Sequence, residues 1–224
     1  MNSIAIDGPS GAGKSSLSRK IAEELGYIYV DTGALYRSIG LAVLQAGKNT
    51  KKADEIEALL PQIDLALRHV DGEQRVFLGS EDVSEAIREE AVSMAASDVS
   101  AHPAVRAFLL ETQRRLAREN NVIMDGRDIG TVVLPNANIK IYLTATVEDR
   151  AMRRTLQLRE AGKQADYETV KKDVEQRDYN DSHRAAAPLK QADDAVLVDT
   201  TGLEFEQSLA LLLSLIKERL IDAT

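Results

Sequence analysis

The sequence contains no cysteine and no tryptophan, and aromatic residues make up only 4% of its 224 positions. Without cysteine the chain cannot form disulfide bonds, thiolate metal sites or a cysteine nucleophile, as is typical of proteins in a reducing compartment. It also lacks a basic excess, because its formal charge is −8. A surface that binds nucleic acid or anionic lipid along its whole extent is therefore not expected, and phosphate chemistry would require a local basic site.

Long apolar runs are missing as well. The longest, Leu209 to Ile216, has eight residues with one serine among them, which is too short to cross a bilayer. No basic leader precedes the first strand-like segment at Ile4. We therefore expect a cytoplasmic monomer without a membrane or nucleic-acid partner. His69, His102 and His183 share no metal-ligand spacing, so no histidine metal site is expected.

Short apolar segments alternate with longer amphipathic ones, a pattern that predicts parallel strands joined by helical crossovers and hence an α/β fold. Strands are expected at 4–7, 27–30, 122–124, 139–143 and 195–198, and helices at 14–25, 34–46 and after each of the last two strands. One stretch breaks this rhythm. Residues 63–70 and 74–78 read as a hairpin around the turn signal Asp71-Gly72, which favours an inserted subdomain.

Residues 8–15, GPSGAGKS, match the P-loop pattern G-x-x-x-x-G-K-[ST] between an expected strand and an expected helix. Glycines let successive backbone N–H groups curl around a phosphate chain, and the helix adds its positive N-terminal end. Lys14 would reach the outer phosphates, and the hydroxyl of Ser15 would ligate Mg²⁺. The motif predicts nucleoside triphosphate binding.

A P-loop alone does not separate a kinase from a switch or a regulatory binding protein. Residues 150–190 contain ten Lys or Arg and seven Asp or Glu, which is a net +3 on an acidic chain. Such a segment is suited to neutralising a transferring phosphoryl group. Arg177, Asp181 and Arg184 would share a face if a helix persists that far. A solvated, salt-bridged helix is the alternative for Arg153 and Arg159.

Acidic and basic residues also follow two expected strands. Asp31, Thr32 and Arg37 come after the second strand, and Asp125 begins the run DGRD after the third. Ligands bind at the carboxyl ends of strands in open parallel sheets, so these residues could orient Mg²⁺ through water, from Asp31 or Asp125, and grip a second anionic substrate. Helix capping is the alternative. Arg106 lies on an expected helix opened by Pro103.

Several motifs together resemble bacterial cytidylate kinases, which belong to the nucleoside monophosphate kinase family of P-loop proteins. The similar segments are GPSGAGKS at 8–15, DTGALYR at 31–37, DGRDIGT at 125–131 and RDYNDSHRAAAPL at 177–189. Their order and spacing extend the resemblance over nearly the whole chain. It implies transfer of the γ-phosphoryl group of ATP to CMP or dCMP, with Mg²⁺ as cofactor.

The resemblance also implies a three-layer P-loop fold with a five-stranded parallel core. In this arrangement one kinase domain comprises three parts, namely the core at about 1–47, 101–148 and 191–224, a CMP-binding insertion at about 48–100, and a lid and arginine-rich segment at about 149–190. The hairpin near 63–78 fits the insertion. Residues 48–96 match no fixed motif of the family, so the resemblance assigns no base contacts to them.

Site residues carry over from the family position by position. The resemblance implies ATP binding by Gly8, Pro9, Ser10, Gly11, Ala12, Gly13, Lys14, Ser15 and Ser16. It implies catalytic roles for Lys14, Arg127, Arg153 and Arg177. For the acceptor, it implies that Thr32, Arg37 and Arg127 hold the CMP phosphate, that Ser97, Arg106, Asp128 and Arg184 read the cytosine ring, and that Asp181 binds the sugar. The alternative function is a P-loop ATPase or GTPase switch, or a regulatory binding protein, without a small-molecule acceptor.

Overall fold

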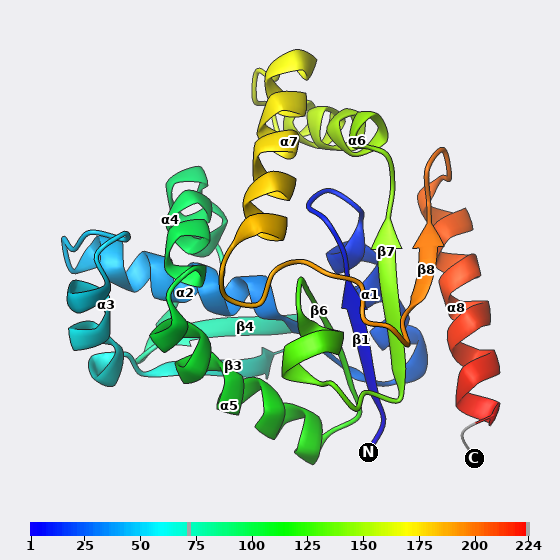
Figure 1. The fold of residues 1–224 in the computed structure, drawn as a ribbon, viewed down its shortest axis with the longest axis horizontal. Coiled ribbons are helices and arrows are strands. Elements are labelled where there is room, and N and C mark those ends of the chain that lie inside the picture. Colours follow the sequence, from blue (N-terminus) through cyan, green and yellow to red (C-terminus); the bar gives the residue numbers. More distant parts are fainter. Residues whose placement is uncertain (71–72, 223–224) are drawn as a thin grey trace. The chain divides into compact units, whose positions relative to one another are not determined.

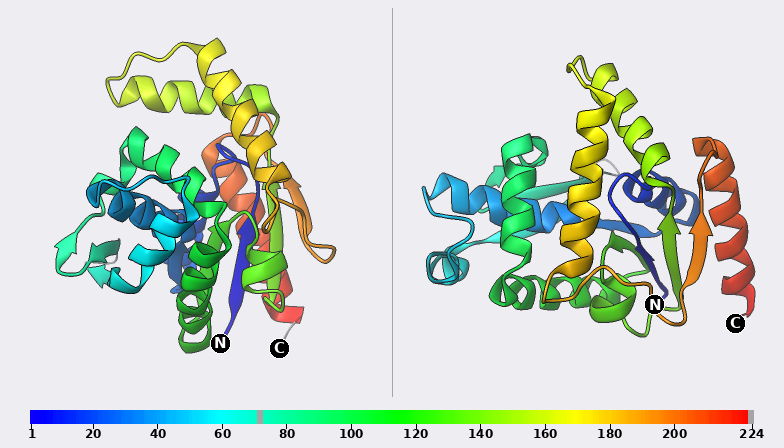
Figure 2. Two further views of the ribbon diagram at one scale, coloured as in Figure 1. Left: turned by 60° about the vertical axis from the view of Figure 1, so that its left-hand side comes forward. Right: turned by 45° about the horizontal axis from the view of Figure 1, so that its top comes forward.

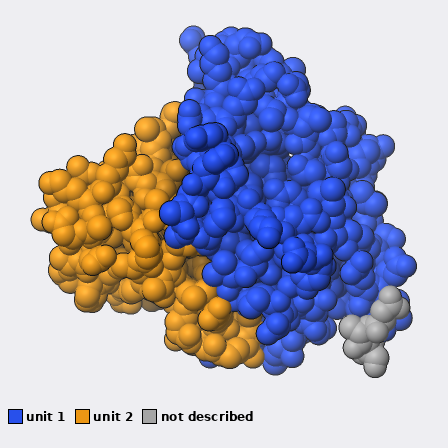
Figure 3. Space-filling model, viewed as in Figure 1, with its two compact units in different colours: residues 1–29, 119–224 blue, residues 30–118 orange. Residues whose placement is uncertain are grey.

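The computed structural model describes residues 1–70 and 73–222. The predicted turn at Asp71-Gly72 lies outside the described residues. Contacts within the chain divide it into two compact units, which Figure 3 colours separately. Unit 1 comprises residues 1–29 and 119–224, and unit 2 comprises residues 30–118. The insertion predicted at about 48–100 falls within unit 2, and its bounds stay a prediction.

A five-stranded sheet with the order β2-β6-β1-β7-β8 forms the centre of the fold (Figure 1). Its strands are β1 (Ser3–Asp7), β2 (Ile28–Asp31), β6 (Val122–Gly126), β7 (Ile139–Thr144) and β8 (Val196–Asp199). Both β6 and β7 pair parallel with β1, and β8 pairs parallel with β7. The predicted α/β fold with a five-stranded parallel core is therefore confirmed. Parallel pairing brings the carboxyl ends of these strands to one edge.

Four helices and one short π-helical turn accompany this sheet in unit 1. They are α1 (Lys14–Leu25), the turn at Ile129–Val133, α6 (Val147–Glu160), α7 (Tyr167–His183) and α8 (Phe205–Asp222). Leu17 and Ile21 of α1 share a buried cluster with Ile4 of β1 and with Leu212 and Ile216 of α8. Leu212 and Ile216 of the last helix thus face the core.

Caps set the ends of these helices. Helix α1 stops at Gly26, whose φ of 67° is left-handed, and α6 starts after Thr146, whose side chain accepts a hydrogen bond from the amide of Asp149. Helix α7 ends at His183, so Arg184 lies beyond it with an extended backbone. The amide of Leu189 folds back onto the carbonyl of Asp181 and closes the helix there. The prediction that Arg184 shares a helical face with Arg177 and Asp181 is therefore wrong, because the helix ends one residue before Arg184.

Helices α6 and α7 pack against each other, and both views of Figure 2 show them side by side. Their contact includes the buried apolar residues Ala151, Val170 and Val174. They occupy the segment predicted to be the lid. In Figure 1, α6 follows the carboxyl end of β7, so this helix pair starts from the edge of the sheet where the carboxyl ends of the parallel strands meet.

Unit 2 combines helices with a small antiparallel sheet. Its main elements are α2 (Thr32–Gln45), α3 (Ala53–Leu59), β3 (Leu65–Val70), β4 (Glu73–Leu78), β5 (Glu81–Asp82), α4 (Glu90–Ser100) and α5 (Pro103–Glu119), with short 3₁₀ turns at Leu60–Gln62 and Ala86–Arg88. Strands β3, β4 and β5 pair antiparallel, which confirms the predicted strand pair and adds a third strand. Leu35, Ile39 and Val99 belong to its core.

Helix α2 begins at Thr32, two residues before the predicted start, because Asp31 acts as its N-cap and accepts the amide of Ala34. No described helix is long and apolar enough to cross a membrane.

Candidate active site

The loop between β1 and α1 has the backbone of a phosphate-binding turn. Gly8 has a φ of 151°, and a Cβ there would lie 1.9 Å from the carbonyl oxygen of Leu143, so only glycine fits. Gly13 is left-handed, with φ at 84°, and serves as the N-cap of α1. Because α1 starts directly after this loop, its unpaired N–H groups face the same space as the amides of the loop.

Lys14 is buried at the start of α1, and its ammonium group donates a 2.7 Å hydrogen bond to the carbonyl of Pro9. Burial, followed by the nearby positive charge of Arg127, lowers the pKa of Lys14 to about 7. The carboxylates of Asp125, Asp181 and Asp7 oppose that change. The buried amine is therefore a weaker base than an exposed lysine, and the carbonyl of Pro9 is its hydrogen-bond partner inside the loop.

Ser15 lies beside the carboxylate that ends β6. Its hydroxyl donates to Oδ2 of Asp125 at 2.7 Å, and the phenol of Tyr29 donates to Oδ1 at 3.0 Å. Asp125 is only 4% exposed. A hydroxyl and a fixed carboxylate are oxygen donors of the kind that Mg²⁺ prefers, so these residues fit the predicted metal.

Among the described residues, no group of three or more His, Cys, Asp or Glu is arranged to hold a metal ion. Magnesium rarely needs such a group, because it keeps several waters and binds through one or two carboxylates together with substrate phosphates. The pair of Ser15 and Asp125 matches that mode of binding better than an all-protein cage does.

The predicted residues of the DGRD run face α7 and the loop after it. Arg127 donates from Nε to Oδ2 of Asp181 at 2.6 Å. Nη2 of Arg184 lies 3.6 Å from Oδ1 of Asp128, and Nε of Arg184 donates to the carbonyl of Ala187. Four of the predicted CMP-binding residues therefore form two opposite-charge pairs within unit 1.

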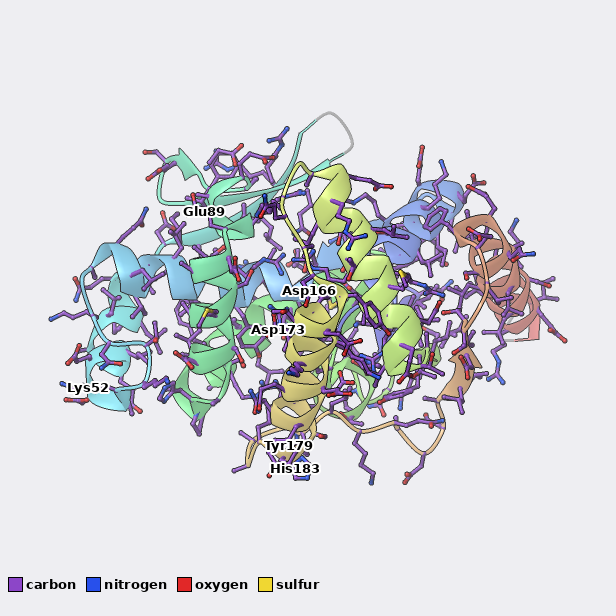
Figure 4. The ribbon with its side chains drawn as sticks, turned by 90° about the horizontal axis from the view of Figure 1, so that it is seen from above. Lys52, Glu89, Asp166, Asp173, Tyr179 and His183 are labelled. Atoms are coloured by element: carbon purple, nitrogen blue, oxygen red, sulfur yellow. The ribbon has the colours of Figure 1, made fainter. Side chains whose placement is uncertain are left out.

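Arg153 and Arg177 come from the helix pair α6–α7. Arg153 forms an ion pair with Asp149 at 2.5 Å and donates to the carbonyl of Thr200 at 2.6 Å. Its Nη1 lies 4.0 Å from the Cβ position of Gly13, so the guanidinium is beside the P-loop. Arg177 is exposed on α7, one turn before Asp181. At the end of the same helix, His183 stacks on Tyr179 with ring centroids 4.1 Å apart (Figure 4).

The other four predicted CMP-binding residues belong to unit 2. Thr32 is buried in the first turn of α2, and Arg37 forms a 2.8 Å ion pair with Asp31. Ser97 is exposed on α4. Arg106 donates to the carbonyl of Ser100. Asp31 thus acts as a cap and as the partner of an arginine, and its water-mediated metal role stays a prediction.

The sequence motifs indicate no role for Asp7, although it ends β1 directly before Gly8. Its buried carboxylate accepts the amides of Ile129 and Gly130 at 2.8 and 2.7 Å. Burial raises the pKa of Asp7 to about 6, and the two amide hydrogen bonds oppose this. The carboxylate thereby joins the start of the P-loop to the turn after Asp128. The position of Asp7 at the end of a strand, next to a loop glycine, is the feature of the sequence that could have indicated a role for it.

The loop between β1 and α1 is rich in glycine and contains a buried lysine. A serine hydroxyl beside it contacts a carboxylate near the end of a strand. These features define the class of P-loop proteins. The profile of the cytidylate kinase family matches residues 4–218. The chain belongs to that family, and the resemblance seen in the motifs is confirmed.

Curated relatives agree with this membership. A cytidylate kinase of Caldicellulosiruptor saccharolyticus is 50% identical over 212 residues, covering 95% of this chain and 94% of that protein. A cytidylate kinase of Desulfitobacterium hafniense is 47% identical over 216 residues, covering 96% and 93%. Among solved structures, an uncharacterised protein of Eubacterium ventriosum is similar in fold, with a TM-score of 0.55 at 12% identity, covering 97% of this chain and 98% of that one.

Proposed function

We propose that this chain is a kinase that transfers the γ-phosphoryl group of ATP to CMP or dCMP, giving ADP and CDP or dCDP. The observation that carries the proposal is the arrangement around Lys14. An amine of lowered pKa lies inside a P-loop, close to the charges of Arg127, Asp125 and Asp181. In a member of the cytidylate kinase family, these are the charges needed to bind a triphosphate and steer its terminal group to an acceptor.

The P-loop would hold the phosphate chain of ATP. Its backbone amides and the first turn of α1 are the donors, and Lys14 leaves the carbonyl of Pro9 to contact the outer phosphates. Ser15 and Asp125 would hold Mg²⁺, directly or through water. When bound, Mg²⁺ supplies positive charge that offsets the charge on the phosphate oxygens.

The arginines would provide the rest of the electrostatic stabilisation. Arg153 lies beside the loop, and Arg177 is exposed on α7. As a phosphate oxygen of CMP attacks the γ-phosphorus in line, these groups, together with Arg127, stabilise the charge that spreads over the migrating group. No covalent enzyme intermediate is required.

Asp128 and Arg184 are suited to reading cytosine. Their facing charges lie 3.6 Å apart, so the pair presents donors from Arg184 beside an acceptor from Asp128. Cytosine offers a carbonyl acceptor and an amino donor, which complement that pair. Uracil has a carbonyl in place of the amino group, so its oxygen would face the carboxylate. A site built to hydrogen-bond one group discriminates strongly against an analogue that lacks it.

The alternative, a P-loop switch without a small-molecule acceptor, is not favoured by the family membership of residues 4–218. Thr32, Arg37, Ser97 and Arg106 remain proposed acceptor residues. The monomeric state, the cytoplasmic location and the absence of nucleic-acid partners remain predictions.

The test is ADP release from Mg·ATP across a panel of nucleoside monophosphates. We expect turnover with CMP and dCMP, and turnover with UMP lower by at least about a hundredfold in kcat/KM. Asp128→Asn should narrow that gap by raising the relative rate with UMP, since the amide can donate to the uracil carbonyl. Equal turnover with AMP, UMP and CMP would reject the substrate assignment, and ADP release independent of any acceptor would favour the switch.

A further inference from the structure

Arg150 is a buried arginine for which the motifs predict no role. It lies in the first turn of α6 with 3% of its surface exposed. Its guanidinium joins three separate segments of the chain. Nε donates to the carbonyl of Ala145 at 2.9 Å, Nη1 donates to the carbonyl of Ser10 at 2.8 Å, and both terminal nitrogens bind the carboxylate of Asp178 at 3.0 and 2.5 Å.

The bond to Ser10 fixes one peptide group of the P-loop. The described residues include no cis peptide, so the carbonyl of Ser10 and the amide N–H of Gly11 point in opposite directions across their peptide plane. Because Arg150 binds the carbonyl, the amide of Gly11 is turned away from Arg150. The two residues are also in close contact, since a Cβ at Gly11 would lie 3.2 Å from the Cβ of Arg150. The arginine therefore fixes both the position and the orientation of the Gly11 amide, one of the amides that the family resemblance assigns to ATP binding.

The bond to Asp178 fixes helix α7. Two parallel N–H···O bonds from one guanidinium to one carboxylate leave the helix little freedom to rotate about that point. Asp178 directly follows Arg177, and Asp181, one turn later, binds Arg127 at 2.6 Å. The helix that carries Arg177 is thus tied to the P-loop through Arg150 and to the end of β6 through Arg127.

We propose that Arg150 is a positioning residue for phosphoryl transfer. It orients the amide of Gly11 toward the phosphates, and through Asp178 it holds Arg177 in register with the same loop. Its role in the transfer step rests on the proposed function, whereas its effect on nucleotide binding does not. Lysine cannot replace it, because a point charge cannot bind the Ser10 carbonyl and both oxygens of Asp178 at once.

Two variants separate these contacts. Arg150→Lys breaks the fork that binds the loop and α7 together. We expect it to raise the dissociation constant for Mg·ATP about tenfold in calorimetry and to lower kcat by at least about tenfold. Asp178→Asn keeps the side-chain shape and removes its charge. We expect it to lower kcat about tenfold while ATP affinity changes less than about threefold, because Ser10 is still bound.

The matched control is Glu148→Gln. Glu148 also joins α6 to α7, through a 2.8 Å ion pair with Lys171 that includes neither Arg150 nor Asp178. Glu148 is exposed and Lys171 is only partly buried, so kcat and ATP affinity should stay within about twofold of the wild type. A loss as large as that of Asp178→Asn would mean that any link between the helices suffices and would overturn the proposal.

The proposal is also overturned if Arg150→Lys or Asp178→Asn, folded by circular dichroism, keeps wild-type kcat at saturating ATP and CMP. If Arg150→Lys does not fold, Asp178→Asn decides alone. Should the wild type show no CMP-dependent turnover, the proposed function fails, but the ATP affinity of Arg150→Lys still tests the positioning of the loop.

Discussion

The hydroxyl of Ser15 donates a 2.7 Å hydrogen bond to Oδ2 of Asp125, joining the first turn of α1 to the end of β6. These residues are 110 positions apart, and they meet because β1 and β6 are parallel neighbours whose carboxyl ends share one edge. Tyr29 holds the other oxygen of the same carboxylate. A hydroxyl and an oriented carboxylate next to a phosphate loop form the pair that the proposed metal requires.

Asp125→Asn should therefore change the dependence on magnesium. The amide retains one oxygen and loses the charge that would attract the ion, so we expect half-maximal rate to require at least about tenfold more Mg²⁺. The measurement is a Mg²⁺ titration of the initial rate at saturating nucleotides. Asp194→Asn, which alters an exposed carboxylate paired with Lys140, is the control. If Asp125→Asn and the wild type show the same magnesium curve, Asp125 does not hold the metal.

Because the pKa of Lys14 is lowered, we expect the protein to take up a proton when it binds ATP. With its pKa lowered to about 7 by burial, most of the amine is neutral at about pH 8 in the free protein. Phosphate oxygens stabilise the ammonium form and raise that pKa, so binding should take up close to one proton per site at about pH 8, and far less at about pH 5.5. Calorimetry in buffers of different ionisation enthalpy measures this number.

Lys14→Met is the control for that experiment, since it cannot titrate. The proton uptake should vanish in the variant, and so should the transfer reaction. A wild-type protein that binds ATP at about pH 8 without taking up a proton would show that Lys14 is already charged in the free loop.

Asp7 predicts a pH dependence of stability. Its folded pKa of about 6 lies above the ordinary value of 3.8, so the folded chain holds the proton more tightly than the unfolded chain. The resulting stabilisation is complete below pH 3.8 and is lost as the pH rises through about 6, with a total on the order of 3 kcal/mol. Asp7→Asn lacks this titration.

Urea unfolding of the wild type and of Asp7→Asn at about pH 4.5 and about pH 7 tests the sign of this change in stability with pH. The stability of the wild type minus that of Asp7→Asn should fall by about 2 kcal/mol between these conditions. An unchanged difference, or one that grows with pH, would mean that Asp7 is ionised with an ordinary pKa in the folded chain.

Ala187 is the one non-glycine residue of the described chain with a positive φ, at 48°. The carbonyl of Ala187 accepts a hydrogen bond from Nε of Arg184, the proposed base-reading residue. This bond helps to hold the loop after α7 in the conformation with positive φ at Ala187. Ala187→Gly removes the Cβ clash, and we expect it to stabilise the fold by about 0.5–1 kcal/mol. The matched change Ala186→Gly, at a residue without positive φ, should destabilise it. Thermal unfolding of both variants measures these changes in stability. An equal loss of stability in the two variants would argue against backbone strain at Ala187.

Much of the fold was predictable because its signals are local. A run such as Ile4 to Asp7 followed by a glycine-rich turn specifies strand, loop and helix within about twenty residues, and Gly26 ends that helix where its freedom at positive φ is needed. The hairpin in unit 2 was predictable from alternating apolar residues together with the turn signal Asp71-Gly72. The short helices α3 and α4 and the π-helical turn at Ile129–Val133 carry weaker local signals, and sequence analysis did not predict them.

The contact partners of the site residues were harder to predict from the sequence. The sequence placed Ser15, Asp125 and Arg127 at strand or helix ends, but nothing local indicates that Arg127 binds Asp181 or that Arg150 binds Asp178. These contacts depend on how α7 returns toward the sheet, which is a property of packing over many residues. In the same way, the start of α2 at Thr32 depends on Asp31 acting as a cap, a role that the sequence leaves open beside a metal-linked one.

The most direct test of the central claim follows the phosphoryl group itself. ATP labelled at the γ-phosphate is incubated with the protein, Mg²⁺ and unlabelled CMP, and the products are separated. The account predicts that the label appears in CDP, in amounts equal to the ADP formed, and that Lys14→Ala abolishes this transfer. Label released as inorganic phosphate at the same rate with and without CMP would contradict it, because the loop would then be hydrolysing ATP without an acceptor.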